Sequence, residues 1–187
     1  MRKTVTYLHV RAISACATRG VLVCGSLSLP CALGRSGRVF RKREGDGASP
    51  VGIWRLNQLY YRHDRIFAIP SNLPSTPIRR GWGWCETVGD RNYNRRVNLP
   101  YATAHEELRR KDDLYDIVVD TSHNRRPRVQ GQGSAIFFHI ARENYTATAG
   151  CIAVSLKDMQ KVLGCCSAKT QLVIWPPSGA TPNVFRR

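Results

Sequence analysis

The segment Phe138-His139-Ile140-Ala141-Arg142 is followed, after five residues, by Thr148-Ala149-Gly150-Cys151, so that one histidine precedes a glycine-flanked cysteine by twelve positions. A cysteine thiol is only partly ionised at neutral pH and becomes a strong nucleophile when a nearby imidazole takes its proton. A glycine before it lets the backbone approach a reacting carbonyl, where amide N–H groups hold an oxyanion. We therefore take these segments as a candidate pair of nucleophile and base.

The composition indicates one globular domain with an unusual positive charge. At 187 residues the chain is long enough to bury a core without disulfides or metals, and its 42% hydrophobic content is ordinary. Lys and Arg number 29 against 13 Asp and Glu, a net charge of +16. Such a field attracts nucleic acid, anionic lipid or an acidic cell-wall polymer. Because the sequence has no RNA-binding aromatic motif and no paired zinc-ligand spacing, we expect no nucleic-acid partner.

The seven cysteines form no metal or disulfide pattern. They stand at positions 16, 24, 31, 85, 151, 165 and 166, and this odd number leaves at least one unpaired in a monomer. The adjacent Cys165 and Cys166 have no Cys-x-x-Cys motif or histidine nearby, which argues against structural zinc. We expect no metal and no cofactor, and we expect most cysteines to be small buried hydrophobic side chains.

The N-terminus carries only fragments of an export signal. Arg2 and Lys3 resemble an n-region and residues 15–17 a cleavage site, but a histidine and an arginine interrupt the apolar segment between them. The uncharged run 20–34 is too short to span a bilayer and is broken by a proline, so no transmembrane segment is expected. Both stretches are expected to form strands.

The residue pattern favours a β-rich chain with two short helices. Strand-like composition occurs at 4–10, 21–29, 53–61, 114–119, 135–140 and 171–175, whereas 34–37, 44–50 and 70–101 are expected to be irregular. Thr103-Ala104-His105-Glu106 has the spacing of a capping box and predicts a helix to about Arg110. Ser155-Leu156-Lys157-Asp158 has the same spacing and predicts a helix to Gly164, which begins four residues after Cys151.

Further motifs occur in a fixed order along the chain. They are Cys31-Ala32-Leu33-Gly34-Arg35, the loop 42–52, Gly83-Trp84-Cys85, Asp90-Arg91-Asn92-Tyr93-Asn94, His105-Glu106, Asp113-Leu114-Tyr115-Asp116 and 133–139, before the segment 148–151. With these motifs the chain resembles the L,D-transpeptidase (YkuD-type) catalytic domain, in particular its compact, stand-alone branch. The resemblance is clearest over 30–175 of a single domain 1–187. It implies a mainly β fold with short helices, a β-sandwich or partly closed barrel.

The resemblance also implies roles for individual residues. His139 corresponds to the catalytic base and Cys151 to the nucleophile, with the amides of Gly150 and Cys151 holding the oxyanion. A backbone carbonyl, of His139 or Ile140, is expected to orient the imidazole. Without the family pattern, Cys151 would be taken as a structural thiol and His139 as a core histidine.

The chain departs from the family pattern beside the nucleophile. Ala149 stands where a second histidine is common, and Ala153 where an arginine is common. We expect Arg142 to compensate by binding the substrate carboxylate. Thr148, Tyr93 and Asn94 are further expected substrate contacts. For Tyr93 and Asn94, a role in structuring a turn is an equal alternative. His123 and His105-Glu106 are alternative bases that are expected to make only loop and helix-cap contacts.

The activity implied is acyl transfer between peptidoglycan stem peptides. Cys151 would attack the carbonyl of the third residue, release D-Ala and pass the acyl group to an amine. Water in place of the amine would give an L,D-carboxypeptidase. A basic, non-catalytic module that binds peptidoglycan or nucleic acid is the alternative from another class. The activity implies a location in the periplasm or cell envelope, although the N-terminus holds no convincing signal. The oligomeric state and the acceptor stay open.

Overall fold

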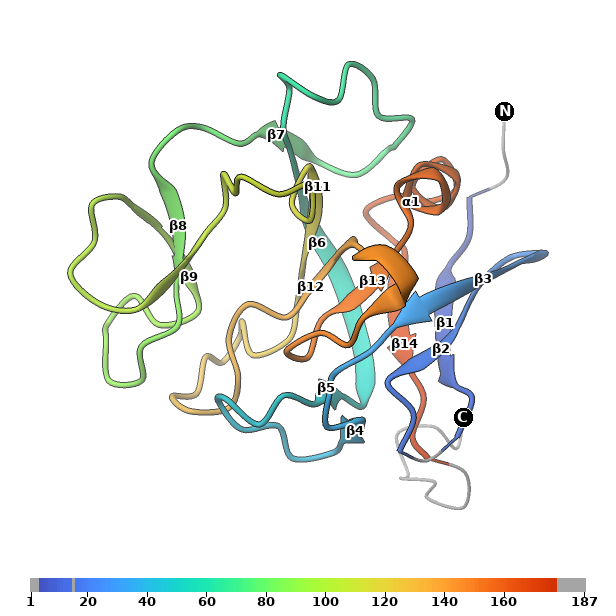
Figure 1. The fold of residues 1–187 in the computed structure, drawn as a ribbon, viewed down its shortest axis with the longest axis horizontal. Coiled ribbons are helices and arrows are strands. Elements are labelled where there is room, and N and C mark those ends of the chain that lie inside the picture. Colours follow the sequence, from blue (N-terminus) through green and yellow to red (C-terminus); the bar gives the residue numbers. More distant parts are fainter. Residues whose placement is uncertain (1–3, 15, 178–187) are drawn as a thin grey trace.

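In the computed structural model, which describes residues 4–14 and 16–177, one large mixed sheet curls into a barrel-like ring (Figure 1). Its strand order is β11-β12-β13-β3-β2-β1-β14-β6-β7, and β11 also pairs with β6, so that every strand except β7 belongs to the ring. The strands are β1 (Tyr7–Ala12), β2 (Arg19–Cys24), β3 (Leu27–Ala32), β6 (Gly52–Tyr61), β7 (Ser75–Pro77), β11 (Ile117–Thr121), β12 (Phe137–Ile140), β13 (Ile152–Val154) and β14 (Gln171–Ile174). The predicted mainly β fold with a partly closed barrel is confirmed.

The ring contains both parallel and antiparallel strand pairs, and one of these pairs is very short. Within the ring the pairs β1–β14 and β12–β13 are parallel and the other neighbours are antiparallel. Outside it, β7 pairs in parallel with β6. Between β13 and β3 a single residue pair, Ala153 with Ala32, is in register. The ring therefore closes through β11–β6, and its shortest pairing is β13–β3.

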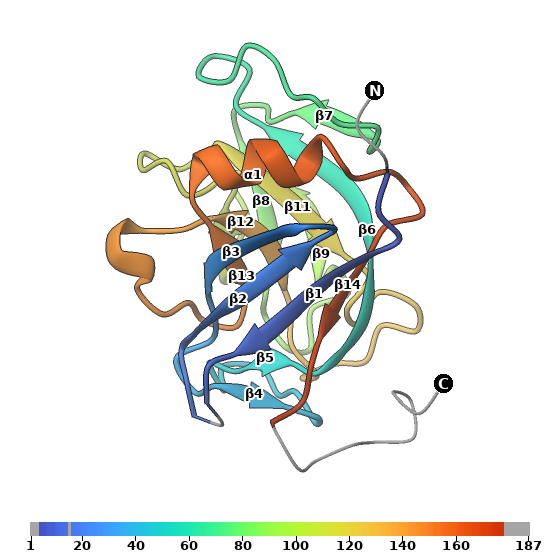
Figure 2. The ribbon, with the colours of Figure 1, turned by 90° about the vertical axis from the view of Figure 1, so that its right-hand side faces the viewer.

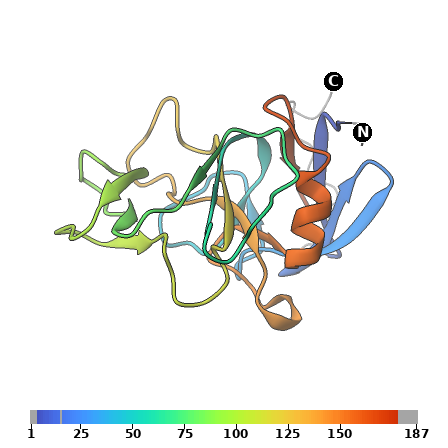
Figure 3. The ribbon, with the colours of Figure 1, turned by 90° about the horizontal axis from the view of Figure 1, so that it is seen from above.

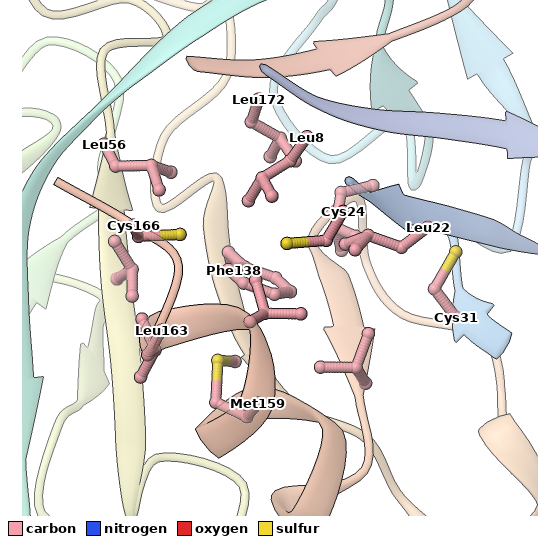
Figure 4. Close-up of a cluster of buried hydrophobic side chains, with 14 of the residues drawn as sticks. Leu8, Leu22, Cys24, Cys31, Leu56, Phe138, Met159, Leu163, Cys166 and Leu172 are labelled. Atoms are coloured by element: carbon pink, nitrogen blue, oxygen red, sulfur yellow. The ribbon is translucent and has the colours of Figure 1, made fainter. Parts of the chain in front are cut away.

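The main hydrophobic core fills the ring, and α1 (Leu156–Leu163) covers it (Figure 2). Met159 and Leu163 of α1 point toward Leu8, Leu22 and Phe138 from the strands (Figure 4). The helix starts as predicted, because the Ser155 side chain accepts a hydrogen bond from the Asp158 N–H at 3.2 Å, and it ends at Gly164. Among residues 4–14 and 16–177, no helix is long and apolar enough to cross a membrane.

A second, smaller core lies outside the ring, under a three-stranded sheet. This sheet has the order β10-β8-β9, with β8 (Trp82–Cys85), β9 (Arg95–Asn98) and β10 (His105–Glu107). It extends from the side of the molecule opposite β1–β3 (Figure 3). The core beneath it contains Trp82, Trp84, Phe137 and Tyr115. The two short strands β4 (Arg38–Val39) and β5 (Ser49–Pro50) pair separately and in parallel. The ring wall formed by β11, β12 and β13 is thus buried on both faces.

The predicted helix from Thr103 to Arg110 is wrong. His105–Glu107 forms β10 and pairs antiparallel with β8, His105 opposite Cys85. The Thr103 hydroxyl donates to Asp90 at 3.0 Å instead of capping a helix turn. A capping box is a local signal, and here pairing with the edge of β8 overrides it.

Two further predictions on strand boundaries need correction. The single strand expected at 21–29 is a hairpin, in which Gly25 takes a left-handed conformation (φ +59°) between β2 and β3. The stretch 70–101, expected to be irregular, contains β7, β8 and β9. Because β8 is buried on both faces, its sequence does not alternate between polar and apolar residues, and the pattern typical of a half-exposed strand is missing.

Replacing Ser155 tests how much α1 depends on its cap. We expect Ser155→Ala to lower the free energy of unfolding by about 1 kcal/mol and the Tm by roughly 2–4 °C. Ser28→Ala, on the exposed face of β3, is the matched control and should change the stability by less than about 0.5 kcal/mol. Equal effects of the two substitutions in urea denaturation would show that the cap contributes nothing.

Candidate active site

The parallel pair β12–β13 brings His139 and the residue before β13 to one face of the ring. His139 lies opposite Ala153 in the register, and Cys151 precedes Ala153 by two residues. Since side chains alternate along a strand, positions 139, 151 and 153 share a face. Their neighbours Phe138 and Ile152 point into the main core instead. The histidine and cysteine therefore lie on the outer face of the ring, beside the second core.

The Cys151 thiol is buried and engaged by backbone groups. The side chain is 7% exposed, donates to the Ala135 carbonyl at 3.1 Å and accepts from the Phe137 N–H at 3.3 Å. Burial, followed by the charge of Glu106, raises the pKa of Cys151 to about 12. The thiol is thus protonated at neutral pH in the substrate-free protein.

The His139 imidazole is buried, neutral and fixed in orientation. Its Nδ1 donates to the Ile140 carbonyl at 2.8 Å, because a carbonyl only accepts, and this leaves Nε2 as the acceptor nitrogen. The ring packs edge-on against Tyr115, with centroids 5.3 Å apart. Burial, followed by the charges of Arg110 and Arg142, lowers the pKa of His139 to about 4. Of the two carbonyls expected to orient the imidazole, that of Ile140 does so.

The turn before Cys151 requires glycine and is closed by Thr148. Gly150 has φ +139°, and a Cβ there would lie 2.7 Å from the Ala48 carbonyl oxygen. The Thr148 hydroxyl donates to the Cys151 carbonyl at 2.7 Å and accepts from the Gly150 N–H at 3.1 Å. The Gly150 amide, expected to hold an oxyanion, is therefore occupied by Thr148 in the free protein.

A cavity of about 310 Å³ opens over the pair. Cys151 and His139 line it together with Thr148, Ala149 and Ala153. Its other walls carry charges of both signs, from Arg35, Lys42, Arg110, Arg142, Glu44, Glu86 and Glu106. Burial raises the pKa of Glu106 and of Glu86, and for Glu86 the charges of Glu106 and Glu44 raise it further. The cavity can thus take a ligand that bears both carboxylate and ammonium groups.

Arg142 reaches the cavity from the segment after β12. Its side chain is 56% exposed, and its guanidinium lies 3.9 Å from the Asp112 carboxylate. A loose, exposed ion pair of this kind contributes little to stability. Arg142 is therefore free to contact a ligand in the cavity.

Tyr93 and Asn94 do not line this cavity but support its wall. Tyr93 is fully buried, and its hydroxyl donates to Glu44. The Asn94 side-chain oxygen accepts from Trp84 Nε1 at 2.9 Å and from the Ala135 N–H at 3.1 Å. Ala135 has a positive φ of 50°, which is unfavourable for alanine, and its carbonyl holds the thiol. Substrate contact and formation of a turn were both left open for Tyr93 and Asn94. The contacts observed are structural.

The alternative histidines lie elsewhere. His123 Nε2 donates to the Gln132 carbonyl at 3.0 Å and its ring packs edge-on against Trp54. His105 Nδ1 donates to the Thr103 carbonyl at 2.7 Å. Neither ring lines the cavity over Cys151. Glu106, by contrast, lines the cavity. It was expected to cap a helix and instead lies within the candidate site.

Sequence reasoning missed the roles of Tyr115, Lys42 and Glu86. Tyr115 and Lys42 lie within motifs of the resemblance, but no role followed from their spacing. Lys42 is buried, pairs with Asp46 and contributes positive charge near Cys151. Glu86 follows β8 directly and carries no local signal. Among the described residues, no group of three or more His, Cys, Asp or Glu side chains could hold a metal ion.

Comparisons with known proteins agree with this geometry. The family described as YkuD, L,D-transpeptidase catalytic domain, matches residues 22–174. No curated protein and no solved structure matches the chain. The family match covers most of the 187 residues, including both His139 and Cys151. The chain therefore belongs to the YkuD family of L,D-transpeptidases, acyltransferases that act on peptidoglycan peptides.

Proposed function

We propose that the protein is a cysteine-dependent L,D-transpeptidase that acts on peptidoglycan stem peptides in the bacterial cell envelope. The observation that carries this proposal is the parallel register of β12 and β13, which puts an oriented neutral imidazole and a thiol at the floor of one cavity. The high positive charge suits an acidic wall polymer.

The first half-reaction forms an acyl-enzyme. Nε2 of His139 accepts the Cys151 proton as sulfur attacks the carbonyl of the third stem residue. The Cys151 amide holds the oxyanion, joined by the Gly150 amide once its bond to Thr148 is exchanged. The imidazolium then protonates the leaving amine of D-Ala. Because the thiol donates to the Ala135 carbonyl in the free protein, it has to turn toward Nε2 of His139 before the proton is transferred.

The second half-reaction transfers the acyl group to an amine. The amine nitrogen attacks the thioester carbonyl, the carbon–sulfur bond breaks, and His139 passes a proton from nitrogen to sulfur. Glu86 faces the negative charges of Glu44 and Glu106 across the cavity, and an incoming ammonium group relieves their mutual repulsion. This charge favours an amine acceptor over water, so transpeptidation is preferred to L,D-carboxypeptidase activity. Arg142 binds a substrate carboxylate.

Acylation by a carbapenem tests the nucleophile. The wild-type protein should gain one adduct mass, because the β-lactam carbonyl is attacked as the stem-peptide carbonyl is. Cys151→Ala should lose the adduct, whereas Cys16→Ala, which removes an exposed thiol, should keep it. Intact mass spectrometry measures both. Absence of an adduct on the folded wild-type protein would favour the non-catalytic binding module.

The pH dependence of acylation tests the neutral pair. The pKa of His139 is about 4 and that of Cys151 about 12, so the reactive neutral form persists between these values. The acylation rate should rise through about pH 4 and stay level to about pH 9. His139→Ala should slow acylation by roughly 10²–10⁴-fold at pH 7. An acid limb near pH 6.5 in stopped-flow measurements would contradict a buried, neutral imidazole.

Glu86→Gln tests the acceptor side of the cavity. With a tetrapeptide muropeptide as donor and a diaminopimelate-containing tripeptide as acceptor, cross-linking should fall roughly tenfold, since a charged hydrogen bond is lost. Hydrolysis of the acyl-enzyme, measured as the tripeptide formed without acceptor, should stay unchanged. Glu107→Gln, at an exposed position of β10, is the matched control and should leave both rates unchanged. A parallel fall in both products would assign Glu86 to the donor instead.

A further inference from the structure

Three cysteines outside the active site gather at the end of α1. Cys24 is the last residue of β2, and Cys165 and Cys166 follow Gly164, the C-cap of α1. All three contribute to the main core or pack against it. In Figure 4 the sulfur atoms of Cys24 and Cys166 are turned toward each other above Phe138. The proposed reaction uses none of them.

Cys165 and the residue after Cys24 both lie near Val5. The Val5 N–H donates to the Cys165 carbonyl at 2.9 Å. A Cβ added to Gly25, the residue after Cys24, would lie 3.6 Å from the Val5 side chain. Val5 therefore lies beside both cysteine-bearing segments. Cys165 is also close enough to Cys24 to help raise the pKa of that thiol.

Cys165 is the more suitable of the two candidate partners for Cys24. The Cys166 thiol is 1% exposed and interacts with the Thr170 side chain. Cys165 is partly exposed and, with Cys24, lines a surface groove of about 950 Å³ between the β1–β2 hairpin and the end of α1. A thiol-reactive molecule of the size of glutathione can reach it there.

We propose that Cys24 and Cys165 are a disulfide-forming pair that, once oxidised, joins the β1–β2 hairpin to the end of α1. Sulfur–sulfur bond formation removes both thiol hydrogens, and a disulfide-bearing oxidant takes up the two electrons and two protons as it is reduced to two thiols. Cys165 attacks the oxidant first to form a mixed disulfide, and Cys24 then displaces the remaining thiol. Burial and the neighbouring Cys165 raise the pKa of Cys24 to about 12, consistent with this order.

The bond would stabilise the element that follows the nucleophile. Cys151, β13 and α1 are consecutive along the chain, and α1 covers the core. A disulfide between positions 141 residues apart closes a long loop and restricts the unfolded chain strongly. An oxidising extracytoplasmic compartment, where a peptidoglycan enzyme works, favours such bonds. The pair itself does not depend on the proposed catalysis.

Oxidation of the full chain with oxidised glutathione tests the proposal. After alkylation of the remaining thiols under denaturing conditions, peptide mapping should show a linked peptide that contains Cys24 and Cys165. The Tm should rise by roughly 5–15 °C, and dithiothreitol should reverse the rise. Because neither readout needs catalysis, a protein that fails to form a carbapenem adduct still gives a result.

Two adjacent substitutions provide the control. Cys165→Ala should abolish the linked peptide and the rise in Tm, whereas Cys166→Ala should keep both. Peptide mapping of the wild-type protein decides the pairing even where a variant unfolds. Recovery of Cys24 and Cys165 fully alkylated, glutathione left attached to Cys165, or a link through Cys166 would each overturn the assignment.

Discussion

The site depends on the parallel pairing of β12 with β13. This pairing is short, with three residue pairs in register, yet it sets which side chains face outward from the ring. A shift of the register by one residue would turn His139 or Cys151 into the main core, among Phe138 and Ile152. Both faces of these strands are buried, so hydrophobic packing on either side holds the register. The relative positions of His139 and Cys151 thus depend on the register of the sheet.

The free protein holds its reactive groups in their uncharged forms. Burial opposes both the thiolate and the imidazolium, and the Ala135 carbonyl takes the thiol hydrogen. Ala135 keeps its unfavourable backbone conformation because Asn94 binds its amide. Asn94 is itself held by Trp84 of the outer sheet. The three-stranded sheet therefore supports the site, although it contributes only part of the cavity wall.

Sequence patterns predicted the parts of the fold that depend on local order. The strand 53–61 and the helix after Ser155 follow from alternation and capping, and both are found where expected. Motif spacing singled out His139 and Cys151, which line one cavity, and their catalytic roles stay a prediction. The helix expected after Thr103 failed because the edge of β8 offers stronger pairing than a single helical turn. The support of Ala135 by Asn94 and the charges of Glu86 and Glu106 arise between segments far apart in the chain, where spacing carries no information.

The connection 141–151 joins two adjacent parallel strands whose positions the sheet already fixes. It carries Arg142 and Thr148 into the cavity. Its ends are held, because Thr148 exchanges backbone hydrogen bonds with Leu33 and Arg35 and Gly150 packs against Ala48. Insertions or deletions between residues 143 and 147 would therefore reshape the entrance without displacing the reactive atoms. The shape of the cavity entrance and the positions of His139 and Cys151 therefore depend on different parts of the chain.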